Sequence, residues 1–164
     1  MTNVRIAGIE DIDDISRVLA ASWKTVYRGI VHDDYLDALK NDHWVEFLNA
    51  GLKSGSIFSM VIEISKKIIG AAILSEAEQK GEANLISFYL LPEKIGQGFG
   101  HVFYSAIEDE LRRRGFQNCV LDVLERNARA IHFYITHGYA DTHKKISATL
   151  GTHNYMCKVF MKSL

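Results

Sequence analysis

The sequence predicts one α/β domain of the α+β type, in which helices flank a mixed, mostly antiparallel central sheet. Its 164 residues suit a single hydrophobic core. Apolar residues make up 48% and charged residues 24%, which is the ordinary balance of a globular protein. Most segments with strand character follow one another directly, and fewer are separated by a helix. A doubly wound sheet would need a helix between successive strands, so this order argues against it. We therefore expect residues 1–164 to form one domain.

The first third of the chain predicts a short strand and three helices. The stretch from Asn3 to Ala7 has strand character, and the acidic residues after it suit the positive first turn of a helix. Apolar residues then recur at helical spacing, namely Ile12, Ile15, Val18, Leu19, Trp23 and Val26. Two shorter helices are expected near His32–Leu39 and His43–Leu52.

The middle of the chain predicts three strands and one helix. Two strands, Ile57–Ile64 and Ile68–Leu74, lie on either side of a lysine pair, and a third, Asn84–Leu91, precedes the only proline. After a glycine-rich turn, apolar residues repeat at i, i+3 and i+4 from Phe99 to Leu111, as in an amphipathic helix. Three arginines and Gly115 then end this helix.

The last third predicts a strand, a helix and a final pair of strands. The strand is expected at Phe116–Val123, and the helix at Asn127–His137, closed by Gly138. The last two strands lie on either side of Gly151. The predicted order of elements is β-α-α-α-β-β-β-α-β-α-β-β.

Composition argues against several classes of partner. The formal net charge is -1 and the isoelectric point is about 6.6, so no bulk electrostatics favour nucleic acid or an anionic membrane. No apolar run approaches the roughly 20 residues of a membrane span, and the N-terminus has no apolar signal region. We expect a cytoplasmic protein in which Cys119 and Cys157 are buried, reduced thiols. The histidines show no ligand spacing, so we expect no metal site.

The most informative segment is the glycine-rich turn from Gly96 to Gly100. It joins a strand ending at Leu91 to a helix starting near Gly98. A helix start offers free backbone N–H groups and a positive dipole to an anion, and glycines let the backbone approach that anion closely. Lys94 and His101 are further candidates for anion contacts. Alone, however, the spacing equally describes a flexible strand-to-helix connection.

Two other phosphate-binding motifs do not match this turn. A Walker loop needs a Lys-Ser or Lys-Thr pair after the last glycine, and the turn has none. A dinucleotide fingerprint needs a third glycine where this chain has His101.

The segment from Phe88 to Gly100 resembles the cofactor motif of the GNAT superfamily of CoA-dependent N-acetyltransferases. That motif runs from an apolar strand, often ending in Pro and an acidic residue, to R/Q-x-x-G-x-G/A at a helix start. This chain departs from it at Ile95, which stands where the family has Arg or Gln.

A second segment, from Leu121 to Tyr139, is similar to the family pattern L-[ED]-V-x(3)-N-x-x-A-I-x-[LF]-Y-x-x-x-G-[FY]. The resemblance implies a GNAT-like fold and acetyl-CoA as the acetyl donor. It also implies cofactor contacts from Phe88, Tyr89, Leu90, Ile95, Gly96, Gln97, Gly98, Phe99, Gly100, His101 and Asn127. Because Ile95 has no polar group, pyrophosphate binding is expected to depend on backbone N–H groups. Asn127 is equally suited to a helix N-cap, and Ile131 and Phe133 are expected in the core.

By the same resemblance, Tyr134 is the predicted general acid; without the motif, it would be interpreted as a core tyrosine. A phenol of pKa about 10 protonates a thiolate of pKa about 8.5 only at a cost of roughly 2 kcal/mol. Hydrogen bonding to the developing thiolate is therefore expected in place of complete proton transfer.

The general base remains open between Asp122, Glu82 and an ordered water. Only about one alkylamine molecule in 10³ is neutral at pH 7, so a base is useful. Asp122 and Glu82 each match a region where some family members place a basic carboxylate, and each is equally suited to a structural role.

We therefore predict an acetyl-CoA-dependent N-acetyltransferase that acts on a primary amine of a small molecule or peptide. Neither cysteine lies in the segment from Phe88 to Gly100 that resembles the cofactor motif. This favours direct transfer of the acetyl group over a covalent acetyl-enzyme intermediate. Substrate-facing aromatic residues are expected at Trp23, Tyr27, Tyr35 and Tyr155. Similar proteins are often homodimers. The alternatives are a non-catalytic acyl-CoA-binding or sensing module and, less favoured by the motifs, a nucleotide-binding protein.

Overall fold

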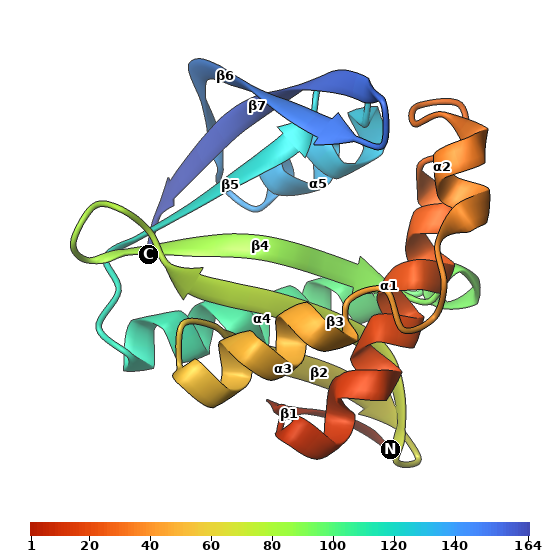
Figure 1. The fold of residues 1–164 in the computed structure, drawn as a ribbon. Coiled ribbons are helices and arrows are strands. Elements are labelled where there is room, and N and C mark those ends of the chain that lie inside the picture. The colour runs from red at the N-terminus through yellow and green to blue at the C-terminus, as the bar shows by residue number, and fades with distance from the viewer.

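The computed structural model describes all 164 residues and contains one seven-stranded sheet. Its strands are β1 (Thr2–Ile6), β2 (Phe58–Ile64), β3 (Lys67–Glu76), β4 (Glu82–Leu90), β5 (Asn118–Leu124), β6 (Ala140–Leu150) and β7 (His153–Ser163). They lie in the order β1-β2-β3-β4-β5-β7-β6, and every neighbouring pair is antiparallel except β4 and β5. The prediction of a mixed, mostly antiparallel sheet is confirmed (Figure 1).

Five α-helices accompany the sheet in the predicted order. They are α1 (Ile12–Val26), α2 (Asp33–Ala38), α3 (Val45–Ser54), α4 (Phe99–Arg113) and α5 (Ala128–Thr136). Two short 3-10 helices, η1 (Ile9–Asp11) and η2 (Pro92–Lys94), were not predicted. Both are single turns, which are too short to produce a hydrophobic period.

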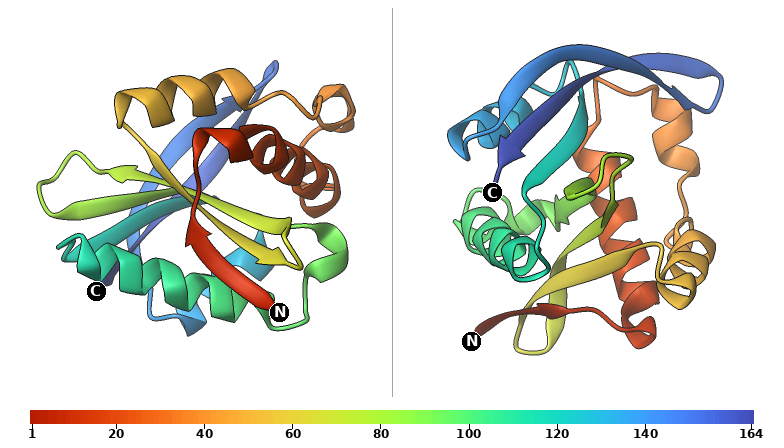
Figure 2. Two further views of the ribbon diagram at one scale, coloured as in Figure 1. Left: turned by 90° about the horizontal axis from the view of Figure 1, so that it is seen from below. Right: turned by 90° about the vertical axis from the view of Figure 1, so that its left-hand side faces the viewer.

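Helices cover both faces of the sheet, with one hydrophobic core on each side (Figure 2). The larger core packs α4 and α5 against the sheet and includes the fully buried Phe103, Tyr104 and Phe160. The other core packs α1 and α3 against β2 and β3 around Ile15 and Leu19. The amphipathic patterns of α1 and α4 therefore identified the faces that these helices bury.

A third apolar cluster joins α2 to the hairpin formed by β6 and β7. The hydroxyl of Tyr155 accepts a hydrogen bond from the backbone N–H of His32 at 2.9 Å. The hairpin turn at Gly151 has a φ of +63° and lies against the ring of Tyr35. These contacts hold the end of the hairpin beside α2 and close one side of the molecule.

The parallel strands β4 and β5 pair only at their beginnings. Residues 82–84 of β4 pair with residues 118–120 of β5, and the two strands then separate. Beyond this point β4 remains bonded to β3, and β5 remains bonded to β7. The edges that face each other therefore carry backbone N–H and C=O groups that no strand satisfies. Figure 1 shows the resulting wedge between the two strands.

The helices and the cysteines can be compared with the expectations about a membrane span and about free thiols. None of the helices combines the length and the apolar character that crossing a bilayer requires. Cys119 and Cys157 are both buried and unpaired, as predicted.

Candidate active site

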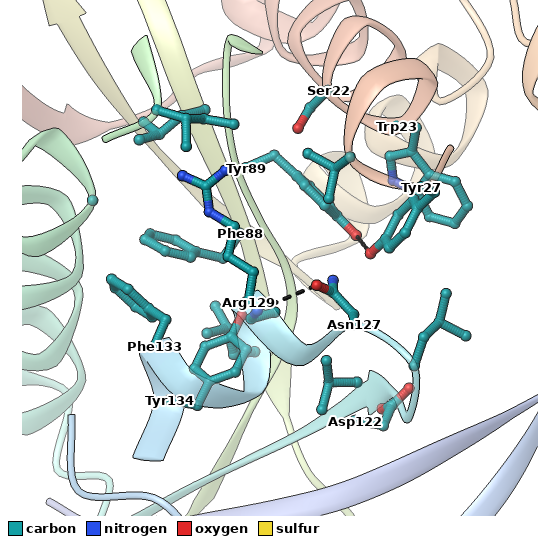
Figure 3. Close-up of a pocket in the computed structure, with 18 of the residues that line it drawn as sticks. Ser22, Trp23, Tyr27, Phe88, Tyr89, Asp122, Asn127, Arg129, Phe133 and Tyr134 are labelled. Carbon is teal, nitrogen blue, oxygen red and sulfur yellow. Dashed lines mark hydrogen bonds between the residues drawn. The ribbon is translucent and has the colours of Figure 1, made fainter. Parts of the chain in front are cut away.

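A cavity of about 490 Å³ occupies the wedge between β4 and β5. It is lined by 25 residues, 17 of them hydrophobic, that come from α1, β4, the glycine turn, α4, β5, α5, β6 and β7. Segments from the first third and from the last third of the chain therefore meet at this cavity. Figure 3 shows the lining side chains from α1, β4, β5 and α5 facing the same space.

The glycine turn forms one end of this pocket. Gly96 and Gly98 have φ values of +81° and +86°, which L-residues rarely adopt. No heavy atom lies within 4 Å of the position that a Cβ would occupy at either glycine. The backbone N–H groups of Gly98, Phe99 and Gly100 make no hydrogen bond within the protein. Together with the positive end of α4, they provide a site for an anion.

Three other predicted residues of this turn differ in their roles. The side chain of Gln97 donates a hydrogen bond to the carbonyl of Glu93 at 2.6 Å and does not line the pocket. Phe99 also lies outside the lining and packs against the larger core. Ile95 lines the pocket, although its side chain can offer only apolar contact.

His101 lines the pocket and is held by a second histidine. Its Nδ1 lies 3.0 Å from Nε2 of His137, and Nδ1 of His137 lies 2.7 Å from the carbonyl oxygen of Phe133. A carbonyl can only accept, so Nδ1 of His137 carries the proton and its Nε2 accepts from His101. This chain of bonds leaves Nε2 of His101 free for a ligand.

Arg129 is a lining residue that the sequence did not single out. It lies in the first turn of α5 and extends across the pocket, with its guanidinium beside β4 (Figure 3). The other arginines all take part in ion pairs or hydrogen bonds, whereas Arg129 takes part in neither. Among the lining residues, only Arg129 is permanently cationic. Arg129 falls at an unspecified position of the family pattern, and a sequence cannot show toward which strand its side chain extends.

The start of α5 combines a structural cap with pocket residues. The side chain of Asn127 accepts a hydrogen bond from the N–H of Ala130 at 3.2 Å, so the predicted N-cap is confirmed. Asn127 also lines the pocket. The expectation that Phe133 is only a core residue was incomplete, because its half-buried ring packs on the core and also lines the pocket. Ile131 packs against the core and does not line the pocket.

Tyr134, on α5, lines the pocket. Its hydroxyl makes no hydrogen bond within the protein, and burial raises its pKa above the ordinary value, with smaller contributions from Tyr27 and nearby acidic groups. The hydroxyl therefore stays protonated at neutral pH and is available as a hydrogen-bond donor to a ligand.

The two predicted basic carboxylates lie in different places. Asp122, on β5, lines the pocket, and burial raises its pKa. Glu82 begins β4 opposite Asn118 and is not a lining residue. Six residues of extended strand, or roughly 20 Å, separate it from Phe88. Phe88, Tyr89 and Leu90, by contrast, all line the pocket.

The end of the pocket opposite the glycine turn is lined by Trp23, Tyr27, Tyr89, Asp122, Leu124 and Leu150, and we call it the acceptor end. The rings of Trp23 and Tyr27 meet edge to face at 4.6 Å, and the hydroxyls of Tyr27 and Tyr89 lie 2.7 Å apart. Of the four aromatic residues predicted to face substrate, Tyr35 and Tyr155 support this region from outside the lining.

Cys157 of β7 also lines the pocket, which the sequence did not predict. Burial, aided by the nearby Asp122, raises the pKa of its thiol to about 11. Since the thiolate is the nucleophilic form, this cysteine is unreactive at neutral pH. No three histidine, cysteine, aspartate or glutamate side chains gather in a way that could hold a metal ion.

Comparison with known proteins gives one consistent family. The model of the acetyltransferase (GNAT) family matches residues 18–139. An uncharacterized N-acetyltransferase of Bacillus subtilis, YuaI, is 32% identical over 142 residues, which cover 81% of this chain and 78% of that protein. Spermidine N(1)-acetyltransferase of Thermoplasma acidophilum is 26% identical over 83% of this chain and 86% of its own.

The fold also matches solved structures. The crystal structure of the PaiA N-acetyltransferase from Thermoplasma acidophilum, in complex with coenzyme A, superimposes with a TM-score of 0.80. The match covers 100% of this chain and 99% of that one, at 21% identity.

Proposed function

The chain belongs to the acetyltransferase (GNAT) family and is an acetyl-CoA-dependent N-acetyltransferase, and we propose that it transfers the acetyl group directly to a primary amine bound in the wedge between β4 and β5. One observation carries this proposal. The facing edges of the two strands are unpaired, and the wedge that they form has the anion-binding turn at one end and Asp122 with Tyr134 farther along it.

The residues present fit acetyl-CoA. The N–H groups of Gly98, Phe99 and Gly100 are free to hold its pyrophosphate, with the guanidinium of Arg129 as a side-chain donor. The free backbone groups of β4 at Phe88–Leu90 would form hydrogen bonds with the pantetheine amides, as a neighbouring strand does. The side chain of Asn127 would also bond these amides. Acetyl-CoA supplies the activated acetyl group as a thioester.

The transfer requires one bond to form and one to break. The nitrogen lone pair of the neutral amine attacks the acetyl carbon, and the carbon–sulfur bond breaks so that its electron pair leaves with the CoA sulfur. The free N–H groups on the edge of β4 are suited to stabilise the negative charge on the carbonyl oxygen. The thiolate accepts a hydrogen bond from the hydroxyl of Tyr134, which has no other partner, and takes its proton from water as CoA leaves.

Asp122 is the carboxylate suited to the amine. It attracts the ammonium form, and although its side chain reaches solvent, desolvation by the surrounding residues raises its pKa and makes it a better proton acceptor than an ordinary aspartate. The ammonium loses one proton to solvent before its nitrogen can attack. A second proton on that nitrogen becomes strongly acidic once the nitrogen bonds to the carbonyl carbon, and this proton passes to Asp122. We do not assign a role to Glu82, because it lies outside the pocket.

Direct transfer is favoured over an acetyl-enzyme intermediate. Cys157 is the only thiol in the lining, and with a pKa of about 11 it is almost entirely protonated at pH 7.

The test is to incubate the protein with acetyl-CoA and a panel of primary amines, and to measure both released CoA thiol and acetylated amine by mass spectrometry. The proposal expects the two products in equal amounts, with thiol release depending on the amine. Acetyl-CoA binding without any acetylated amine would overturn it.

A further inference from the structure

The acceptor end carries very little charge for a site that receives an amine. Of the 25 lining residues, Asp122 is the only acid and Arg129 the only permanent cation. The rest of the acceptor end is aromatic or aliphatic, namely Trp23, Tyr27, Tyr89, Leu124 and Leu150.

We propose that the acceptor is a primary monoamine, with a single positive charge attached to an aromatic or similarly bulky apolar body. This inference rests on the function proposed above. One carboxylate satisfies one ammonium group, and a ligand with further charges would have to bury them without partners, which is costly.

The aromatic side chains support both parts of such a ligand. The ring centroids of Trp23 and Tyr27 lie 4.6 Å apart, and that of Tyr89 lies 6.2 Å from Trp23 and 6.3 Å from Tyr27. Rings at these distances offer edges and faces to another ring and attract a cation placed over them. The tyrosines remain neutral, because burial raises the pKa of Tyr27 to about 12 and raises that of Tyr89 well above its ordinary value.

A buried, unpartnered hydroxyl indicates independently that the pocket as a whole is completed by a ligand. Ser22 lies on α1 next to Trp23, is 1% exposed, and lines the pocket. Its Oγ is the only buried side-chain nitrogen or oxygen without a hydrogen-bond partner. In Figure 3 this hydroxyl is directed into the pocket. Leaving such a group unsatisfied costs free energy that a polar ligand atom would recover.

Polyamines fit this lining poorly. Spermidine, the substrate named for one relative, carries three positive charges at neutral pH, and two remain after one nitrogen loses its proton. Asp122 could balance one of these charges, whereas the other would lie among aromatic and aliphatic side chains with no carboxylate to pair with it.

The first experiment compares kcat/KM for 2-phenylethylamine, spermidine and dialanine at saturating acetyl-CoA. We expect the value for 2-phenylethylamine to exceed the other two by at least tenfold. An equal or higher value for spermidine or dialanine would overturn this inference and leave the proposed function intact. A complete lack of acetylation with every amine would overturn the proposed function, and this inference with it.

The second experiment changes the charge of the lining. Ala148 of β6 lines the pocket, whereas its neighbour Thr149 is exposed and lies outside the lining. We expect Ala148→Glu to lower kcat/KM for 2-phenylethylamine by tenfold or more and to raise it for spermidine. Thr149→Glu adds the same charge one residue away and should leave both values within about twofold. Equal responses of the two variants would contradict the inference.

Discussion

At the scale of single residues, the pocket separates groups that face the reacting atoms from groups that hold the ligands. Tyr134 and Asp122 lie where the two substrates are expected to meet, whereas Arg129 and His101 lie where phosphate is expected to bind. Substitutions of the two kinds should therefore change different kinetic constants.

Removal of the Tyr134 hydroxyl should slow the chemical step. With no donor for the departing sulfur, we expect Tyr134→Phe to lower kcat by about 10²-fold while the Kd for acetyl-CoA changes little. Steady-state rates and calorimetric titration measure the two effects. Tyr35→Phe is the control, because it removes a hydroxyl outside the lining. Equal losses of activity in both variants would contradict the role of Tyr134.

Asp122→Asn should change the pH profile and should not reduce stability. Burial raises the pKa of Asp122, so the ionised form that accepts a proton is lost at a higher pH than for an ordinary aspartate as the pH falls. We expect asparagine to lower kcat/KM and to remove this acidic limb. A raised folded pKa also means that the carboxylate destabilises the fold at neutral pH. Thermal unfolding at pH 7 should therefore show an equal or higher Tm for the variant; a clearly lower Tm would indicate a structural role.

Arg129→Gln should weaken acetyl-CoA binding. A charged hydrogen bond to phosphate contributes about 1.5–3 kcal/mol, so we expect the Kd to rise by at least tenfold and to depend less on salt. Arg126→Gln is the control, because Arg126 bonds the carbonyl of Gly29 and does not line the pocket. Unchanged affinity in Arg129→Gln would show that its guanidinium does not face the phosphates.

At the scale of elements, the turn before α4 illustrates what the sequence could predict. Its glycine spacing identified a helix start with a positive φ, and the structure confirms the positive φ at Gly96 and Gly98. It was also evident from the sequence that Ile95 places no polar side chain at the position where the family has Arg or Gln. Arg129 extends into the same pocket from another helix. Its position depends on tertiary packing, which a local sequence pattern cannot predict.

The turn can be tested with two glycines of matched geometry. Gly98 and Gly115 lie at opposite ends of α4, both with a φ of +86° and with no atom within 4 Å of a Cβ position. Alanine should cost each position about 1–2 kcal/mol of folding free energy. Only Gly98→Ala should also raise the Kd for acetyl-CoA, because the backbone approaches the ligand there. Similar affinity in the two variants would contradict an anion site at this turn.

At the scale of the whole molecule, the wedge between β4 and β5 is the feature that produces the site. The hydrophobic pattern and the turn residues predicted the order of elements, and the GNAT resemblance implied their arrangement. The pattern of the strands alone, however, does not show that β4 and β5 separate after residue 84. The same limitation explains why Cys157 was not predicted in the lining and why Glu82 was considered as a base. Whether Cys157 and Glu82 reach the pocket depends on which end of β7 and which end of β4 lie at the wedge.

The central claim is that the wedge holds acetyl-CoA and the amine together, so that transfer is direct. Initial rates measured over a matrix of acetyl-CoA and amine concentrations test it most directly. We expect intersecting lines in double-reciprocal plots, because both substrates must be bound in a ternary complex before transfer. Parallel lines, together with an acetyl group found on Cys157 after incubation with acetyl-CoA alone, would contradict it.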